Sequence, residues 1–380
     1  MNKRFLLQLL PILMTFFAMG FVDLAGTATN YLKADFNLSD TLANSFASMV
    51  FFWFLICSVP SGMLMNKIGR RKTVLLSLYL TLLALVMPLF KYNLPVMLVS
   101  LSLLGIGNAI MQVSLNPLLS NITPPSKLSS ALTLGQFIKA IAAFIGPIAT
   151  AACALHFGNW VLLMGFFAIE GLIALLWLRK TEIHEQATDK ASSFKECFGL
   201  LKNWSVLLCF LGIMCHVGID VGTNVSAPKI VMEKLQIPLS QAGFATSVYF
   251  IFRTFGSLSG VAILAKFNAR RFFGLSVLFL LIGMAGLIPA ETKWQLFGCL
   301  ALIGFGNANI FPVVFAQAMR IRPDKKNEIS GLMIMGICGG ALFPTIMGGV
   351  TDVVGSQVGA VAVMLCCIFY LLGFCKKIKS

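Results

Sequence analysis

Residues Gly105 to Ile110 read GIGNAI inside a long apolar run, and residues Gly304 to Asn309 repeat this phrase as GFGNAN. Three further landmarks recur with offsets of 197 to 200: Asp23 returns as Asp220, 62–72 returns as 260–271, and Pro147 returns as Pro344. These common offsets indicate that a six-segment unit has been duplicated in parallel. Two such halves are typical of a secondary transporter, whose substrate site lies between them near the middle of the bilayer.

The composition places the chain in a membrane. Hydrophobic residues make up 58% of it, charged residues only 11%, and the mean hydropathy is +0.88. A soluble globular protein has about 25% charged residues. A lipid-exposed backbone must satisfy its own hydrogen bonds, so each apolar run of about 20 residues is expected to form a helix.

The sequence predicts an all-α integral membrane protein with twelve transmembrane helices in two six-helix, pseudo-symmetric bundles. The expected bundles are 1–178 and 204–380, joined by a cytoplasmic linker at 179–203. The expected spans are 6–32, 42–65, 72–90, 94–119, 129–152, 160–178, 204–228, 240–265, 271–289, 294–319, 328–350 and 357–374.

Basic residues fall mainly on one side of these spans. One set of loops and termini holds 22 Lys and Arg residues and the other holds five. The positive-inside rule therefore predicts cytoplasmic termini and a location in the cell's inner membrane. The net charge of +15 follows from this asymmetry, so we expect lipid rather than nucleic acid as its partner.

The N-terminal apolar stretch runs for about 27 residues without a small-residue cleavage site, which favours a retained helix over a signal peptide. The ten cysteines show no metal-ligand spacing and are expected to be packing residues. We expect a monomer that needs no cofactor or bound metal.

The loop Gly62 to Lys72 resembles the loop signature of the major facilitator superfamily: a glycine, a leucine, an acidic residue, then basic residues around a second glycine. Asn66 stands at the usual aspartate position. Arg70 and Arg71 are candidates for gating contacts, since their charges suit helix C-termini or acidic lipid. Topogenic charge is the alternative explanation.

Within that superfamily the chain resembles the fucose/proton symporter family along almost its whole length. The resemblance rests on FFAMGFVD ending at Asp23, QVSLNP from Gln112, Gln136 and Arg253. It implies transport of a hexose, with an acid in the first helix and a glutamate in the fourth for proton coupling and sugar recognition. Here Gln112 replaces the glutamate and Asp23 stands one turn early, so proton and sodium both remain open as the coupling ion.

Asp23, Thr27 and Asn30 share one face of the first helix, where a carboxylate could bind sodium or carry a proton. Lys139, three residues after Gln136, is a candidate ion-pair partner of Asp23, and the sequence leaves open whether the two residues pair. A structural ion pair for Asp23 and snorkelling of Lys139 are the alternatives.

His216 and Asp220 lie one turn apart and compete with Asp23 as the coupling site, because imidazole and carboxylate can share a proton. Asp220 could instead bond to loosened helix backbone. Arg253 could clamp a protein carboxylate in a gating pair or an anionic substrate. Glu170, in a helix expected to face lipid, is the buried charge least suited to touch substrate.

Neutral amides in the spans offer donors and acceptors together, which suits hydroxyl-rich solutes. The candidate substrate-binding residues are Asn30, Asn108, Gln112, Asn116, Gln136, Asn224, Asn307 and Asn309. Aromatic rings such as those of Trp53, Tyr249, Phe250 and Phe311 are candidates to stack on a sugar, or simply to pack between helices.

The leading hypothesis is cation-coupled symport of a monosaccharide by alternating access. The alternatives are a transporter or exporter of another, possibly anionic, solute and a transporter-like membrane sugar sensor. No nucleophile with a base, metal cluster or phosphate-binding loop is apparent, so we do not expect an enzyme.

Overall fold

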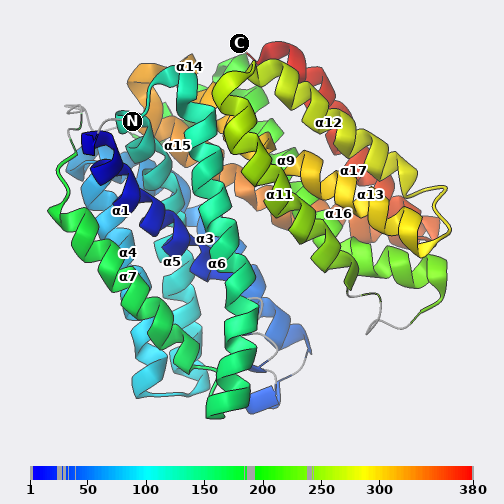
Figure 1. Cartoon of the computed structure of the whole chain (residues 1–380), viewed down its shortest axis with the longest axis horizontal. Coiled ribbons are helices and arrows are strands. Elements are labelled where there is room, and N and C mark those ends of the chain that lie inside the picture. The colour runs from blue at the N-terminus through cyan, green and yellow to red at the C-terminus, as the bar shows by residue number, and fades with distance from the viewer. Residues whose placement is uncertain are drawn as a thin grey trace. The chain divides into compact units, whose positions relative to one another are not determined.

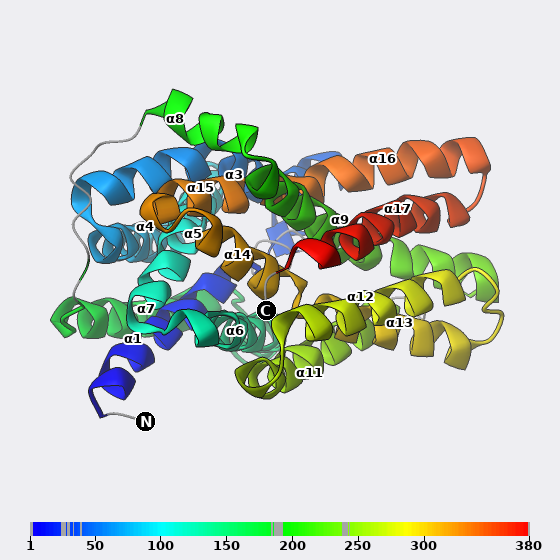
Figure 2. The ribbon, with the colours of Figure 1, turned by 90° about the horizontal axis from the view of Figure 1, so that it is seen from above.

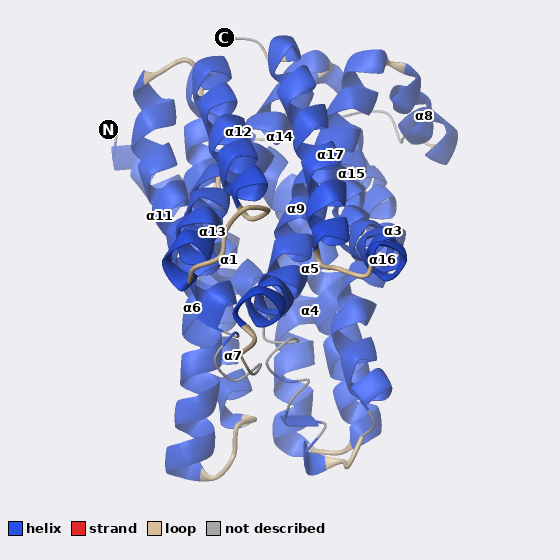
Figure 3. Cartoon of the chain, turned by 90° about the vertical axis from the view of Figure 1, so that its right-hand side faces the viewer, coloured by secondary structure: helices blue, strands red, loops and turns tan. Residues whose placement is uncertain are grey.

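The computed structural model describes residues 3–23, 28, 31–32, 34–38, 40–183, 185, 193–237, 242 and 244–378, and every regular element in these ranges is helical (Figure 3). Within them, eleven helical segments are long and apolar enough to cross a membrane, and Phe52–Ile68 is a further, shorter apolar helix. The predicted all-helical, twelve-crossing membrane fold is confirmed.

The helices gather into two compact units. Unit 1 contains α1 (Lys3–Met19), η1 (Gly20–Asp23), α3 (Asp40–Ile68), α4 (Arg70–Phe90), α5 (Leu94–Ile122), most of α6 (Leu128–Phe157), α7 (Leu162–Lys180), α8 (Phe194–Gly199) and α15 (Lys326–Met335) (Figure 1). Here α4 packs along α5 and α7, and α3 packs against α5 and α15. In Figure 2 the short helix α8 lies beside α3 and α15, which it contacts.

Unit 2 contains α9 (Trp204–Leu235), α11 (Phe244–Lys266), α12 (Ala269–Gly286), α13 (Lys293–Asn307), α14 (Ile310–Ile321), α16 (Gly339–Val354) and α17 (Val358–Phe374). Helix α13 packs against α11 and α12, while α9 packs against α14, α16 and α17. The first turns of α6 also belong to this unit.

Two short segments cluster with the half of the sequence to which they do not belong. Residues 126–134 join unit 2, where Ser130 Oγ donates to the Val261 carbonyl at 2.7 Å. Residues 324–335 join unit 1, where a Cβ built on Gly331 would lie 2.8 Å from the Ser58 carbonyl oxygen. The two segments are equivalent in the sequence repeat, so the same segment of each repeat joins the unit formed mainly by the other repeat.

Side-chain caps fix where several helices begin. The Asn93 side chain accepts a hydrogen bond from the Val96 amide at 2.9 Å, and Asn203 and Asn268 cap α9 and α12 in the same way. Thr292 and Gln295 form a reciprocal capping box at α13. These caps satisfy amides that the first helical turn leaves free.

Glycines of the repeated phrase allow the same close helix packing in both units. A Cβ on Gly107 would lie 3.2 Å from the Ser77 carbonyl oxygen, and one on Gly306 would lie 2.6 Å from the equivalent Ser276 oxygen. Glycine is needed where helix backbones approach this closely. The repeat noticed in the sequence therefore corresponds to a repeated packing contact.

Three membrane-crossing stretches are interrupted. In the first stretch α1 gives way to a 3-10 turn at Gly20–Asp23. The tenth stretch breaks at residues 308–309 between α13 and α14, and in the eleventh a 3-10 turn at Gly336–Cys338 separates α15 from α16. Broken helices place backbone and polar side chains where a membrane protein can bind a polar solute.

Candidate functional site

Five polar side chains from three helices of unit 2 form a connected hydrogen-bonded group, named here the α9–α13 cluster. Its members are His216, Asp220, Tyr249, Arg253 and Asn307. His216 is only 3% exposed, and Tyr249 and Asn307 are fully buried. A buried polar group is expensive unless its partners are present, and this cluster supplies them.

Asp220 is the acceptor at the centre of the cluster. Arg253 Nη2 lies 3.1 Å from Asp220 Oδ2, which makes an ion pair between α9 and α11. The Tyr249 hydroxyl and Asn307 Nδ2, the latter at 3.4 Å, donate to Asp220 Oδ1. The Asp220 carboxylate thus accepts hydrogen bonds from side chains of both α11 and α13.

Asn307 connects the carboxylate to the histidine. Its Nδ2 donates to the Tyr249 hydroxyl at 2.9 Å, and its Oδ1 lies 2.9 Å from His216 Nδ1. An amide oxygen only accepts, so Nδ1 of His216 carries a proton in this arrangement. His216 and Asp220, predicted to share a proton, are linked through Asn307 with no direct hydrogen bond between them.

The local backbone explains how Asn307 reaches its partners. A Cβ on Gly304 would lie 2.3 Å from the Tyr249 carbonyl oxygen, so only glycine lets α13 approach α11 this closely. At the helix break, Asn309 Nδ2 donates to the Gly256 carbonyl at 2.9 Å. Asn309, a candidate for substrate binding, therefore holds α14 to α11 through Nδ2, while its buried Oδ1 has no hydrogen-bond partner.

The ion pair differs from the rest of the cluster in its accessibility. The side chains of Arg253 and Asp220 are 33% and 18% exposed, respectively. An accessible pair of opposite charges within an otherwise buried network can exchange partners with a solute or a cation. Asn224, on the same helix as Asp220, is exposed and lies outside the cluster.

Three of the predicted amides of unit 1 form a ladder along α5, Gln136 lies on α6, and Asn30 lies outside the described residues. Asn108 Nδ2 donates to the Met19 carbonyl at 2.6 Å, Gln112 Nε2 donates to Asn108 Oδ1 at 2.8 Å, and Asn116 Nδ2 donates to the Gln112 carbonyl at 2.9 Å. Asn116 Oδ1 and Gln136 Nε2 are buried and have no hydrogen-bond partner. Such groups in a native structure require an explanation, and a bound ligand is one.

Asp23 and Lys139 are not paired. Asp23 ends η1 and is exposed, Lys139 is half-buried on α6, and no ion pair joins them among the described residues. Their helices do meet, since a Cβ on Gly20 would lie 2.7 Å from the Lys139 carbonyl oxygen. The candidate pairing is therefore absent from this structure, because helix proximity alone does not fix side-chain direction. Thr27 and Asn30 lie outside the described residues.

The loop signature is built into a second polar group in unit 1, named here the α3–α15 cluster. Its members are Asn66, Arg70, Asn121, Asn327 and Glu328. Asn66 Nδ2 donates to Glu328 Oε1 at 2.9 Å, Asn327 Nδ2 donates to Asn66 Oδ1 at 2.6 Å, and Arg70 Nε donates to Asn327 Oδ1 at 2.7 Å. The carboxylate missing at position 66 is thus supplied by Glu328 of α15.

Arg71 has a separate set of contacts within unit 1. Its Nε donates to the Leu178 carbonyl at 3.2 Å, at the end of α7. The Glu185 carboxylate accepts from the amides of Arg70 and Arg71 at 2.6 and 2.7 Å, which caps the N-terminus of α4. The structure therefore brings Arg70, but not Arg71, into the α3–α15 cluster.

Glu170 lies on α7, and both of its carboxylate oxygens are buried without a hydrogen-bond partner.

Tyr249, Asn327 and Glu328 were not among the predicted polar partners. The sequence marks Tyr249 only as an aromatic ring that could stack on a sugar or pack between helices. The glycines at 62 and 331 are a sequence signal for the α3–α15 approach, but pairing them requires a tertiary structure.

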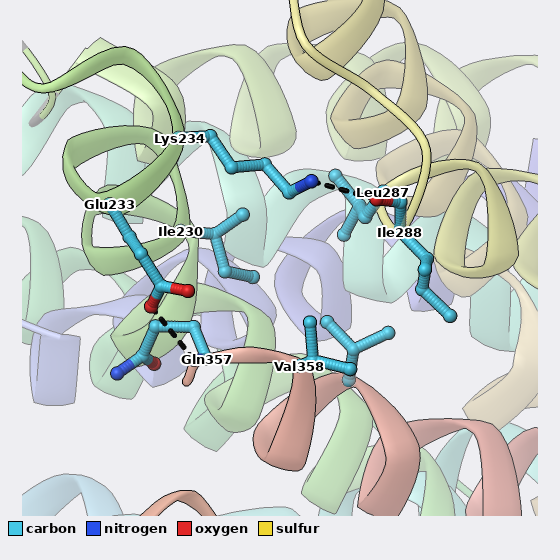
Figure 4. Close-up of a pocket in the computed structure, with 8 residues that line it drawn as sticks. Ile230, Glu233, Lys234, Leu287, Ile288, Gln357 and Val358 are labelled. Atoms are coloured by element: carbon cyan, nitrogen blue, oxygen red, sulfur yellow. Dashed lines mark hydrogen bonds between the residues drawn. The ribbon is translucent and has the colours of Figure 1, made fainter. Parts of the chain in front are cut away.

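A small pocket of unit 2 lies where α9 ends and α17 begins, beside the connection that follows α12 (Figure 4). Glu233 accepts from the Gln357 amide at 2.8 Å next to the start of α17, and Lys234 Nζ donates to the Ile288 carbonyl at 2.7 Å. The cavity is only about 10 Å³, enough for about one water molecule. These residues fasten helix ends, and the pocket is too small for a solute.

The sequence model of the Major Facilitator Superfamily matches residues 12–223 and 208–377. A glucose/galactose transporter of Brucella abortus is 24% identical, with 96% of this chain and 92% of the relative aligned. The L-fucose-proton symporter of Escherichia coli is 24% identical over 87% of this chain and 84% of its own.

A probable nitrate transporter, NarT of Staphylococcus epidermidis, is 25% identical over 80% of this chain and 78% of its own. Among solved structures, the transporter FucP in its outward conformation aligns over the full length of both chains with a TM-score of 0.87 and 17% identity. That similarity concerns the fold.

Proposed function

Because the chain belongs to the Major Facilitator Superfamily, we propose that it moves a monosaccharide across the inner membrane by alternating access, coupled to sodium or a proton. The sugar-transporter relatives support the substrate class. The excess of basic residues in one set of loops supports cytoplasmic termini. We further propose that the chain is not an enzyme.

The observation that carries this proposal is the accessible Asp220–Arg253 pair within the buried α9–α13 cluster. Charged side chains inside a membrane are costly and are kept where they serve binding or ion movement. The cluster combines a carboxylate, a guanidinium, a phenol and an amide, and these groups both donate and accept. In unit 1, considered separately, Asn116 Oδ1 and Gln136 Nε2 are a buried acceptor and a buried donor without hydrogen-bond partners, which are groups of the kind that bind hydroxyls.

Coupling is proposed to act through the same pair. If Asp220 takes up a proton or binds a sodium ion, its attraction for Arg253 falls and the guanidinium is released toward substrate. The donors around Asp220 would then have to reorganise, which links cation binding to the position of α11 relative to α9. Asp23 remains a second candidate, since its exposed carboxylate has no ion-pair partner among the described residues.

The α3–α15 cluster is proposed as the contact that must open when the transporter changes state. It joins the end of α3 and the start of α4 to α15, a helix from the other half of the sequence: three of its four hydrogen bonds reach α15, and the fourth joins Arg70 to Asn121 of α5. Breaking it would free the signature loop. In this proposal Arg70 is a gating residue.

The test is counterflow in proteoliposomes with a panel of labelled hexoses, followed by accumulation in sodium buffer and in sodium-free buffer at two pH values. We expect counterflow with at least one hexose, and accumulation that needs one of the two cations. Asp220→Asn should lose accumulation and keep counterflow. If Asp220→Asn accumulates normally and Asp23→Asn does not, the coupling role moves to Asp23. If no hexose exchanges, the sugar assignment is wrong.

A second candidate is transport of a small anion. Arg253 is one-third exposed, and a nitrate-transporter relative aligns over most of the chain. A guanidinium binds planar oxyanions well. Uptake of nitrate that Arg253→Gln abolishes, in vesicles that exchange no hexose, would favour this candidate.

A further inference from the structure

Glu170 is a carboxyl group inside the membrane to which the proposed transport cycle gives no role. It is the ninth of the 19 residues of α7, so it lies near the middle of a membrane-spanning helix. Both of its carboxyl oxygens are buried, and neither has a hydrogen-bond partner among the described residues. Asp220, by contrast, has an ion pair and two hydrogen-bond donors. The two carboxyl groups therefore have very different surroundings.

The contacts that α7 makes on either side of Glu170 are apolar. Helices α1 and α4 pack along α7 (Figure 1). The Phe167 ring stacks on the Phe21 ring with 4.1 Å between their centroids, and a Cβ on Gly171 would lie 3.3 Å from Leu82 Cδ2. These contacts replace none of the hydrogen bonds that a carboxylate makes with water.

Several charged or titratable side chains belong to the elements around α7. Helix α6 is one of these elements, because a Cβ on Gly146 would lie 3.9 Å from Phe167 Cζ. The residues concerned are Lys3 and Arg4 of α1, Asp23 of η1, Arg70, Arg71, Lys72 and Tyr79 of α4, and Lys139, Cys153 and His156 of α6. No ion pair joins Glu170 to any of them in the part of the chain that the structure describes.

The basic residues of α1 and α4 lie toward the far end of α7. Arg71 Nε donates to the carbonyl of Leu178, which is eight residues past Glu170, or about 12 Å along the helix. Gln8 Nε2 donates to the carbonyl of Glu182, still farther along the chain, and Lys3 and Arg4 precede Gln8. The cations of these two helices are therefore too distant to neutralise a charged Glu170.

An ionised carboxyl group inside a membrane needs a counter-ion or several donors, and without them the neutral acid is the more stable form. We propose that Glu170 is a proton-binding site, at which a carboxylic acid keeps its proton within the bilayer. Because neither oxygen is hydrogen-bonded, no hydrogen-bonded path among the described residues leads the proton away. The proton is therefore retained during transport, and Glu170 is open to reagents that attack protonated carboxyl groups in an apolar phase.

The test uses dicyclohexylcarbodiimide, an apolar reagent, on the full-length protein in proteoliposomes. The carboxyl proton passes to one carbodiimide nitrogen while the carboxyl oxygen bonds to the central carbon, and the adduct rearranges to a stable N-acylurea. Nothing leaves and nothing is oxidised or reduced. Peptide mapping then compares Glu170 with the exposed carboxyl groups of Glu291 and Asp352. In parallel, the infrared spectrum of Glu170→Gln is subtracted from that of the wild-type protein at pH 7.

We expect Glu170 to be labelled roughly tenfold or more above the two controls, because an ordinary carboxyl group at pH 7 is protonated in only about one molecule in 1,000. The difference spectrum should contain the carbonyl band of a protonated carboxyl group. Absence of labelling at Glu170, or a carboxylate band in place of the carbonyl band, would overturn the proposal. The labelling uses wild-type protein, so it gives a result even if Glu170→Gln does not fold.

Transport by Glu170→Gln tests whether the proton is retained. We expect counterflow and accumulation near wild type, since the amide is as neutral as the acid. Accumulation that is lost while counterflow remains would mean that the Glu170 proton is exchanged, which would overturn its retention. Labelling and infrared spectra need no transported solute, so they test the proton site even if the hexose assignment is wrong.

Discussion

Asn307 Oδ1 lies 2.9 Å from His216 Nδ1, and the equivalent residues of the other repeat, Asn108 and Met19, are also hydrogen-bonded. In unit 1, Asn108 Nδ2 donates to the Met19 carbonyl at 2.6 Å, so the asparagine of the repeated phrase meets the same position of the first helix of its unit. In unit 1 the asparagine bonds to a backbone carbonyl, whereas in unit 2 it bonds to the titratable ring of His216. The duplication thus keeps the contact while the chemistry has diverged.

Asn307→Ala is expected to destabilise the protein by about 1–3 kcal/mol, because it leaves His216 Nδ1 without its partner inside unit 2. The measurement is the midpoint of thermal unfolding in detergent. Asn224→Ala, which removes an exposed amide on α9, is the control and should unfold near wild type. Equal midpoints for the two variants would show that the cluster contributes little to stability.

Neutralising one member of the Asp220–Arg253 pair should destabilise the protein more than neutralising both members. Each single variant, Asp220→Asn or Arg253→Gln, leaves one charge in the membrane without the opposite charge of this pair, whereas the double variant removes both charges. Both side chains are partly exposed, so we expect a coupling free energy of only about 1–2 kcal/mol. A double-mutant cycle on unfolding measures it, and additive single effects would mean that the pair is not coupled.

Asn66→Asp should loosen the α3–α15 cluster, because it places a carboxylate within hydrogen-bond distance of Glu328. Two like charges at that separation repel strongly, and the amide donor to Glu328 Oε1 is lost as well. Hydrogen exchange of residues 324–335 is expected to speed up by roughly tenfold, equivalent to about 1.4 kcal/mol. Adding Glu328→Gln should restore slow exchange, and failure to do so would mean that charge repulsion is not the cause.

Cys197 on α8 should be alkylated slowly. It is fully buried, and burial, followed by the nearby carboxylates of Glu328 and Glu196, raises the pKa of its thiol from 9.0 to about 11. A raised pKa leaves about a hundredfold less thiolate at pH 8 than an ordinary thiol has, and thiolate is the reactive form. Peptide mapping after iodoacetamide treatment should show labelling that increases as pH rises toward 11. Rapid labelling at pH 7 in the native protein, matching that of the protein unfolded in detergent, would contradict this.

The sequence was sufficient for the features that depend on periodicity. The duplication, the membrane spans and the choice of Asp220, Arg253 and Asn307 as candidate residues all follow from apolar runs interrupted at repeated positions. Contacts that depend on helix rotation were not predictable in the same way: Asp23 and Lys139 lie on helices that meet but do not pair. Tyr249 could not be distinguished from a packing aromatic until its hydroxyl was seen against Asp220.

The close approach of α13 to α11 can be tested with two glycines of one helix. A Cβ on Gly304 would meet the Tyr249 carbonyl at 2.3 Å and the Arg253 amide nitrogen at 3.1 Å, whereas one on Gly298 would meet nothing within 4 Å. Gly304→Ala must push α13 away from α11, at a cost of about 1–3 kcal/mol, and should weaken the bonds of Asn307. Gly298→Ala should be neutral or stabilising by up to about 1 kcal/mol, since alanine favours helix more than glycine does.

Thermal unfolding of both variants, together with hexose counterflow, measures these effects. Loss of stability and transport in Gly304→Ala alone would show that backbone contact assembles the α9–α13 cluster. Equal behaviour of the two variants would mean that α13 does not need this approach.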